Sequence, residues 1–216
     1  MMRYLAIILL IIVGIASYAA PKQPKTLFRT EKYLCFIKKY HVLANDTNVM
    51  HGRYQLCYRG KDIESGSYDR GRRIGVWKFY NNANDNYVME LTYDYSRRKP
   101  LKIQPHIVGT YDTKNYPSIF LGSPLLPSYF ISAHATYPEE VHGEDLNKKV
   151  VIALHINSSG KMTGYHYIKE STPDINKSIT HALEKIPKDW EWLPARKNGI
   201  NVASDYIITI IVEAVV

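Results

Sequence analysis

Hydrophobic and polar residues follow four different patterns along the chain. An apolar run without charge covers residues 5–20, and short aromatic-rich runs with Gly or Asn/Asp turns cover residues 34–95. Residues 100–133 contain five prolines and show no helical period. From residue 137 onward the pattern becomes strand, strand, helix and strand. Because alternation with a period of two predicts strands, we expect an α+β protein with an N-terminal antiparallel β-meander.

The C-terminal elements are the most sharply patterned. Residues 150–156 and 161–170 alternate around an Asn-Ser-Ser-Gly turn and predict a hairpin. Thr172 suits the N-cap of a helix, since Pro173 follows at the first helical position, where proline is favoured. Apolar residues then recur at helical spacing. A β-branched run at 206–212 predicts a last strand that is well buried or covered by a partner.

The N-terminal apolar run predicts export. After a positively charged start, residues 5–20 would form a helix of about 24 Å, shorter than the ~30 Å hydrocarbon core of a bilayer. Ser17 and Ala19 are small residues at the −3 and −1 positions, so we expect residues 1–19 to be a signal peptide cleaved before Ala20. An uncleaved N-terminal anchor in the inner membrane is the alternative.

Composition refines this picture. The chain has 216 residues, of which 45% are hydrophobic and 22% charged, so a globular protein of one or two domains is expected. Its 18 tyrosines favour β-structure with half-exposed aromatic surfaces. The net charge is +8. An exported protein rarely meets nucleic acid, however, so we expect no nucleic-acid partner and interpret the basic surplus as solvated surface.

The first hairpin brings two cysteines together. The runs LCFIKKYHVL (34–43) and VMHGRYQLCY (49–58) flank a loop of turn formers. Centring the loop on Asp46 collects the apolar side chains on one face and sets Cys35 directly opposite Cys57. Opposed Cβ atoms lie ~4.5–5.5 Å apart, near disulfide reach, and exported proteins are oxidised. We hypothesise a Cys35–Cys57 disulfide; the alternative is two free thiols, since any bulge would spoil the pairing.

Eight histidines raise the question of a metal or catalytic site. His155 and His166 fall diagonally on one face of the C-terminal hairpin, where diagonal neighbours are ~7–8 Å apart. Two imidazoles without a third and fourth ligand make a weak site, and the sequence contains neither HExxH nor CxxC. It also lacks G-x-S-x-G and a glycine-rich phosphate loop. We therefore predict no enzyme activity, no catalytic residues, no metal and no cofactor.

A Gly-x-aromatic pattern repeats in the first half of the chain. The string ESGSYDRGRRIGVWKFYN (64–81) fits G-x-Y-x-x-G-x-x-x-G-x-W-x-x-Y at every position from Gly66 through Tyr80. On this pattern, residues from about 50 to 95 resemble the MORN-like repeats of the YwqK antitoxin-type family, which implies short hairpins. We expect the aromatics to form the core of a small sheet. A YwqK-like antitoxin or structural repeat role is a second alternative for the function.

A second set of motif positions spans residues 137–213, and W-x-P-A-x-x-x-G is its most specific part. The motif residues are Tyr137, Pro138, Gly160, Trp192, Pro194, Ala195 and Gly199. On these residues the region resembles the TonB C-terminal domain family. The resemblance implies helices on one face of a three-stranded antiparallel sheet. It also implies a binding role, because this domain docks short peptide segments of outer-membrane receptors by strand addition at a sheet edge.

The expected organisation is a signal peptide or anchor, a MORN-like β-meander, a Pro-rich connector and a TonB-like domain, bounded at 1–19, 20–99, 100–133 and 134–216. We expect an exported envelope protein that binds another protein, an outer-membrane receptor or other envelope protein, and is linked to outer-membrane transport. A terminal strand often lies outermost, so the expected binding edge is Tyr206, Ile207, Ile208, Thr209, Ile210 and Ile211. A homodimer could also cover this edge. The alternative function is a genuine energy transducer for TonB-dependent receptors, retained by its N-terminal helix.

Overall fold

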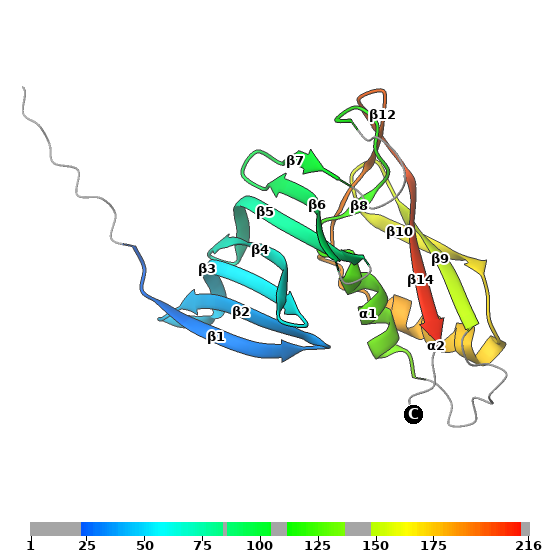
Figure 1. Ribbon diagram of the computed structural model, residues 1–216, viewed down its shortest axis with the longest axis horizontal. Coiled ribbons are helices and arrows are strands. Elements are labelled where there is room, and N and C mark those ends of the chain that lie inside the picture. Colours follow the sequence, from blue (N-terminus) through cyan, green and yellow to red (C-terminus); the bar gives the residue numbers. More distant parts are fainter. Residues whose placement is uncertain (1–22, 84–85, 105–111, 137–147, 213–216) are drawn as a thin grey trace, which may run out of the picture.

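The computed structural model describes residues 23–83, 86–104, 112–136 and 148–212. Its strands form a seven-stranded sheet, a three-stranded sheet and two short two-stranded ladders. Helix α1 lies between the two larger sheets, and α2 lies beside the three-stranded sheet (Figure 1). The chain is therefore a mixed protein with a large antiparallel sheet, as the predicted α+β class requires.

Some of the predicted features lie outside the described residues. They are the signal peptide of residues 1–19 and the motif residues Tyr137 and Pro138. Among the residues that are described, neither helix has the length and apolar character needed to traverse a bilayer.

The seven-stranded sheet is an antiparallel meander in which each strand pairs with the next along the chain. The meander predicted for residues 34–95 is confirmed and is extended by one strand at each end. Two of its hairpin turns, Arg59-Gly60 and Arg70-Gly71, have both residues at positive φ, the geometry whose twist suits the flanking strands. The strands are β1 (Thr26–Tyr33), β2 (Phe36–Leu43), β3 (Asp46–Tyr58), β4 (Lys61–Asp69), β5 (Arg72–Ala83), β6 (Asn86–Asp94) and β7 (Lys99–Ile103).

Trp77 is the centre of this sheet's core. Its side chain is fully buried. Gly66 on the neighbouring strand leaves room for the indole, because a Cβ there would lie only 2.2 Å from ring carbons. The rings of Tyr54 and Tyr68 pack around it, with centroids 5.3 and 5.2 Å away. The expectation that the repeat aromatics form a core agrees with the burial of Tyr54, Trp77, Phe79 and Tyr93.

The register of the first hairpin changes along its length. At the turn Leu43 pairs with Asp46, the residue on which the loop was expected to be centred. Val42 then pairs with Met50, as predicted, and after a further irregularity Tyr40 pairs with Tyr54. The irregularity falls beside Gly52, whose φ of +103° is open mainly to glycine. Since the register moves by two residues, each strand keeps its predicted faces, and the buried side chains include Phe36, Val42, Tyr54, Leu56 and Tyr58.

The same irregularity separates the two cysteines. Cys57 pairs with Ile37 rather than with Cys35. Cys35 lies in the turn before β2, where Leu34 has a φ of +57°. Both thiols are free, Cys35 exposed and Cys57 buried, so the hypothesised Cys35–Cys57 disulfide is wrong in this structure.

The proline-rich connector contains a helix that the sequence analysis did not predict. Strand β8 (Ile119–Phe120) and helix α1 (Leu125–His134) both fall within residues 100–133. Pro124 is the N-cap and Pro127 lies in the first turn, where the missing amides would have had no helical partner. The prolines therefore start this helix rather than prevent it. Tyr129 of α1 contacts the first sheet, since its hydroxyl lies 2.5 Å from that of Tyr58.

The C-terminal region builds the three-stranded antiparallel sheet in the order β10-β9-β14. The hairpin register predicted about Ser159-Gly160 holds through its centre, where Tyr165 pairs with Leu154. The predicted last strand is present as well. The elements are β9 (Lys148–Ile156), β10 (Met162–Lys169), α2 (Pro173–Glu184), β11 (Trp192–Leu193), β12 (Ala195–Lys197), β13 (Ile200–Val202) and β14 (Ser204–Val212).

Helix α2 begins and packs as its sequence predicts. Thr172 is the N-cap in extended conformation, and its carbonyl accepts a hydrogen bond from the Asn176 amide (2.9 Å). The apolar stripe of the helix is buried, as are the side chains on one face of the sheet. Tyr167 of β10 ties the helix to that face, because its hydroxyl donates to the Asn176 carbonyl (2.8 Å). The opposite face of the sheet carries the exposed side chains described below.

Candidate functional site

Strand β14 forms one edge of the three-stranded sheet, as predicted for residues 206–211. Among the described residues it pairs only with β9. The Asp205 carbonyl accepts a hydrogen bond from Ser118 Oγ (3.2 Å) and so faces away from β9. Because backbone groups alternate in direction along a strand, the next outward-facing amides and carbonyls belong to Ile207, Thr209 and Ile211.

The opposite residue on β9 supports this assignment. His155 pairs with Asp205, and its carbonyl accepts from Thr163 Oγ1 of β10 (3.2 Å). The His155 carbonyl thus faces β10, as expected when the Asp205 carbonyl faces outward. The backbone groups that bond to β9 therefore belong to the even-numbered residues of β14.

The two faces of β14 differ in burial. Ile208, Ile210 and Val212 are buried against the helices' side of the sheet, whereas Ile207 and Ile211 are 51% and 59% exposed. The prediction that this strand is well buried or covered holds for one face only among the described residues. No described strand pairs with the outer edge of β14, and the free backbone groups of such an edge are a template for pairing with another chain.

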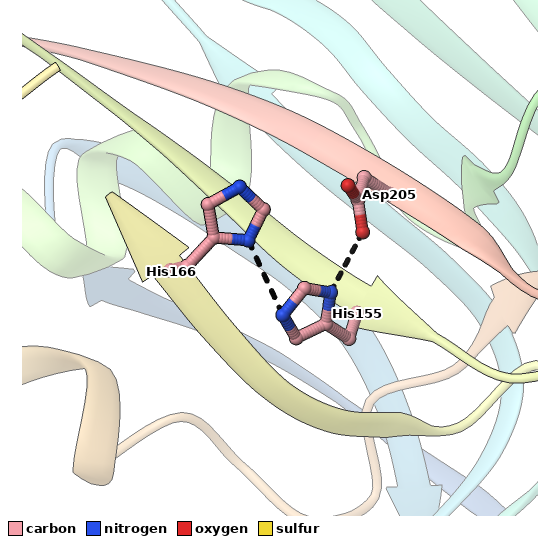
Figure 2. Close-up of side chains that lie close together, drawn as sticks. All are labelled: His155, His166 and Asp205. Atoms are coloured by element: carbon pink, nitrogen blue, oxygen red, sulfur yellow. Dashed lines mark hydrogen bonds and ion pairs between the residues drawn. The ribbon is translucent and has the colours of Figure 1, made fainter. Parts of the chain in front are cut away.

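A row of three polar side chains crosses the open face of the same sheet (Figure 2). His166 comes from β10, His155 from β9 and Asp205 from β14. His155 Nδ1 lies 2.7 Å from Asp205 Oδ1, and His155 Nε2 lies 3.2 Å from His166 Nδ1. The imidazoles are stacked, with centroids 4.9 Å apart and planes at 25°, closer than a typical diagonal pair.

Sequence reasoning paired the two histidines but missed Asp205. One donor atom from each of the three side chains lies within 4.8 Å of the others, so Asp205 is a third polar group beside the two histidines. Asp205 lies two residues before Ile207, so the alternation of side chains along a strand places it on the same open face. Its position opposite His155 depends on how β14 aligns with β9, and the sequence alone does not fix that alignment.

The family-motif residues within the described range are structural. Gly160 has a φ of +79°, and its carbonyl accepts from the Trp192 amide (3.1 Å). Trp192 is buried and pairs with Phe120 in the β11–β8 ladder. Ala195 starts β12, and Gly199 forms the turn to β13. Pro194 follows Trp192 and contributes to the wall of a cavity of about 430 Å³.

Arg73 links the first sheet to the segment before α1. Its Nη1 donates to the Leu121 carbonyl (2.6 Å) and to the Tyr95 hydroxyl (2.7 Å). Its guanidinium also lies over the Trp77 ring, 4.4 Å from the centroid. Two cavities, of about 440 and 430 Å³, share Arg73, Leu121 and Glu191 in their walls. These contacts anchor the connector to the first sheet.

Glu64 is a buried carboxyl in the same junction. It is 1% exposed and accepts a hydrogen bond from the Ser123 amide (2.6 Å). Its other oxygen lies 3.8 Å from Arg73 Nη2. Burial raises the pKa of Glu64 above its ordinary value, against the lowering effects of Arg73 and the Ser123 amide. Glu64 therefore holds the connector against the first sheet, although burial disfavours the charged form of its carboxyl group.

We compared the chain with known proteins in three ways. Searches against protein-family models, curated protein sequences and solved structures gave no match. The resemblance to the TonB C-terminal domain consequently rests on the motif residues of this chain. What the domain does is proposed below from the edge strand and its neighbours.

Proposed function

We propose that the C-terminal region is a protein-binding module that captures an extended segment of its partner by strand addition at β14. The observation that carries the proposal is the outward-facing edge of this strand. The amides and carbonyls of Ile207, Thr209 and Ile211 offer main-chain hydrogen bonds in the plane of the sheet. The exposed side chains of Ile207 and Ile211 offer apolar contacts that would select the partner's alternate residues.

The class of partner comes from the family resemblance. An antiparallel sheet of three strands packed against helices supports a TonB-like C-terminal domain. We therefore propose that the protein is exported, acts in the periplasm or cell envelope without catalysis, and binds an outer-membrane receptor or another envelope protein. The apolar segment of residues 5–20 supports export.

Two alternatives make different use of the same edge. An energy transducer would hold the N-terminal segment in the inner membrane while β14 binds a receptor. A homodimer would pair β14 of one copy with β14 of another. Alkaline carbonate extraction of the envelope distinguishes an anchored chain from a soluble one, and light scattering of the purified protein distinguishes a dimer from a monomer.

Substitution at Thr209 tests strand addition. Thr209→Pro removes an outward-facing amide, while the bonds to β9 come from its even-numbered neighbours and persist. Thr209→Ala keeps the amide and is the matched control. An unsatisfied partner carbonyl costs about 1–3 kcal/mol, so the proline variant should bind about tenfold more weakly, or worse, and the alanine variant nearly normally.

The probe is a panel of short peptides from the periplasm-facing segments of outer-membrane receptors of the same organism. Affinity is measured by fluorescence anisotropy, and hydrogen exchange follows the individual amides. Strand addition protects the amides of Ile207, Thr209 and Ile211 together. A peptide that binds both Thr209 variants equally, with no protection along β14, would show that the binding edge has been misassigned.

A further inference from the structure

The three side chains on the open face form an ordered chain of hydrogen bonds. An ionised carboxylate only accepts hydrogen bonds, so Asp205 Oδ1 accepts from His155 Nδ1. His155 Nε2 then carries a lone pair in the neutral ring. It accepts a hydrogen bond from His166 Nδ1, 3.2 Å away. Asp205 thus fixes the tautomer in which His155 Nε2 is able to bind a metal ion.

We propose that His155 and His166 bind one divalent transition-metal ion of the Zn²⁺ class, with Asp205 holding His155 in place. Zn–N bonds of ~2.0–2.1 Å at tetrahedral angles put two ligand nitrogens about 3.3 Å apart. The observed separation of His155 Nε2 and His166 Nδ1 is 3.2 Å. The pair is therefore already spaced as two ligands of a tetrahedral ion.

Asp205 acts through His155 rather than as the third ligand. Its Oδ1 lies 2.7 Å from the far nitrogen of the same ring. A carboxylate in that position orients a metal-binding imidazole and raises its basicity. The ion's remaining positions are open to water or to a partner's side chain, since His166 and Asp205 are both exposed.

Binding requires one proton to move. The hydrogen on His166 Nδ1 is replaced by the ion and is taken up at Nε2 through exchange with water. The ring stays neutral and keeps one N–H, so no oxidant or other reactant is needed. Imidazole ligands favour Zn²⁺, Ni²⁺ and Cu²⁺, whereas Mg²⁺ and Ca²⁺ favour oxygen ligands. The site should therefore discriminate between these two groups of ions.

The first sheet supplies a matched control. His51 Nδ1 lies 3.2 Å from Asp69 Oδ1, so this ring also has a carboxylate beside it, but its Nδ1 accepts a hydrogen bond from the Arg70 amide (3.3 Å). Among the described residues, however, only His155, His166 and Asp205 form a group of three candidate donors. His51→Gln should therefore leave metal binding unchanged. This inference does not depend on strand addition at β14.

The test is calorimetric titration of the full chain with ZnCl₂, NiCl₂ and MgCl₂, alongside NMR of the imidazole nitrogens. We expect one Zn²⁺ or Ni²⁺ per chain, no saturable Mg²⁺ binding, and signals from His155 and His166 that shift together. His155→Gln and His166→Gln should each weaken binding at least tenfold, and Asp205→Asn about 10–100-fold. Circular dichroism checks that each variant folds.

Two results would overturn the proposal. One is the absence of saturable Zn²⁺ or Ni²⁺ binding by the wild-type chain. The other is a loss of affinity in His51→Gln equal to that in His166→Gln, since this would assign binding to scattered surface histidines. His166 is exposed, so its variant should fold even if the His155 variant does not.

Discussion

Replacing Gly160 by alanine tests the backbone contact between the β9–β10 turn and Trp192. Gly160 has a φ of +79°, and a Cβ there would lie 2.1 Å from the Trp192 carbonyl oxygen. A backbone oxygen cannot rotate away as a flexible side chain can. The turn or β11 must move, which disrupts the hydrogen bond from the Trp192 amide to the Gly160 carbonyl.

The expected loss of stability has two parts. A non-glycine residue in the left-handed region costs roughly 1–2 kcal/mol. Loss of a hydrogen bond adds about 0.5–1.5 kcal/mol, and displacement of the buried Trp192 adds to that. Gly160→Ala should therefore lower the free energy of unfolding by about 2–4 kcal/mol. At ~2–4 °C per kcal/mol for a chain of this size, Tm should fall by about 5–15 °C.

Gly199→Ala separates the two parts. Gly199 has a φ of +80°, nearly that of Gly160, but a Cβ there would meet nothing within 4 Å. This variant should lose only about 1–2 kcal/mol, measured by urea unfolding beside Gly160→Ala. If both variants lose the same free energy, the close approach to Trp192 contributes nothing, and the structural explanation of this motif glycine is refuted.

Two other predictions concern titratable groups. Because burial raises the folded-state pKa of Glu64, its favourable contribution is present at low pH and is lost as pH rises through that pKa. The stability of Glu64→Gln relative to wild type, from urea unfolding at several pH values, should therefore increase with pH above about 4.5; a constant or falling difference would contradict this. Burial, aided by a hydrogen bond to Asp62, raises the pKa of Cys57 to about 11, and partial burial also raises the pKa of Cys35. A thiol reagent at pH 8 should therefore label exposed Cys35 before Cys57, which should react only on unfolding. Equal labelling rates, or failure of both to react in denaturant, would contradict this.

Short-range patterns predicted the faces of elements better than their long-range alignment. The apolar alternation of the first hairpin gave the correct buried side chains, because the irregularity at Gly52 moves the register by an even number of residues. The Cys35–Cys57 pairing needed the register itself and was wrong. Helix α1 was not predicted, because its prolines at the N-cap and in the first turn were interpreted as part of a connector, yet it is a short helix with several buried side chains. The sequence also gave little sign of β1, whose residues are almost all exposed.

In the candidate site, too, the faces of strands were predicted correctly and a contact between distant strands was not. Alternation placed His155 and His166 on one face, and the terminal position of the last strand suggested the edge. Asp205 was missed, because its partner is a residue of a strand far away in the sequence. Two signals together could have identified Asp205. It shares a strand face with Ile207 and Thr209, because every second residue of a strand lies on the same face, and the last strand of the C-terminal region pairs with the first.

Asp205 separates the two proposed sites on β14. Its side chain holds His155, and its carbonyl is occupied by Ser118, so outward pairing starts at Ile207. A partner strand would lie in the plane of the sheet, whereas a metal ion would lie above its open face. The sites should therefore work independently: Thr209→Pro should leave Zn²⁺ binding unchanged, and His166→Gln should leave peptide binding unchanged in the absence of metal. If Zn²⁺ instead tightens peptide binding by tenfold or more, the partner supplies one of the ion's open ligands, and the independence argued here fails.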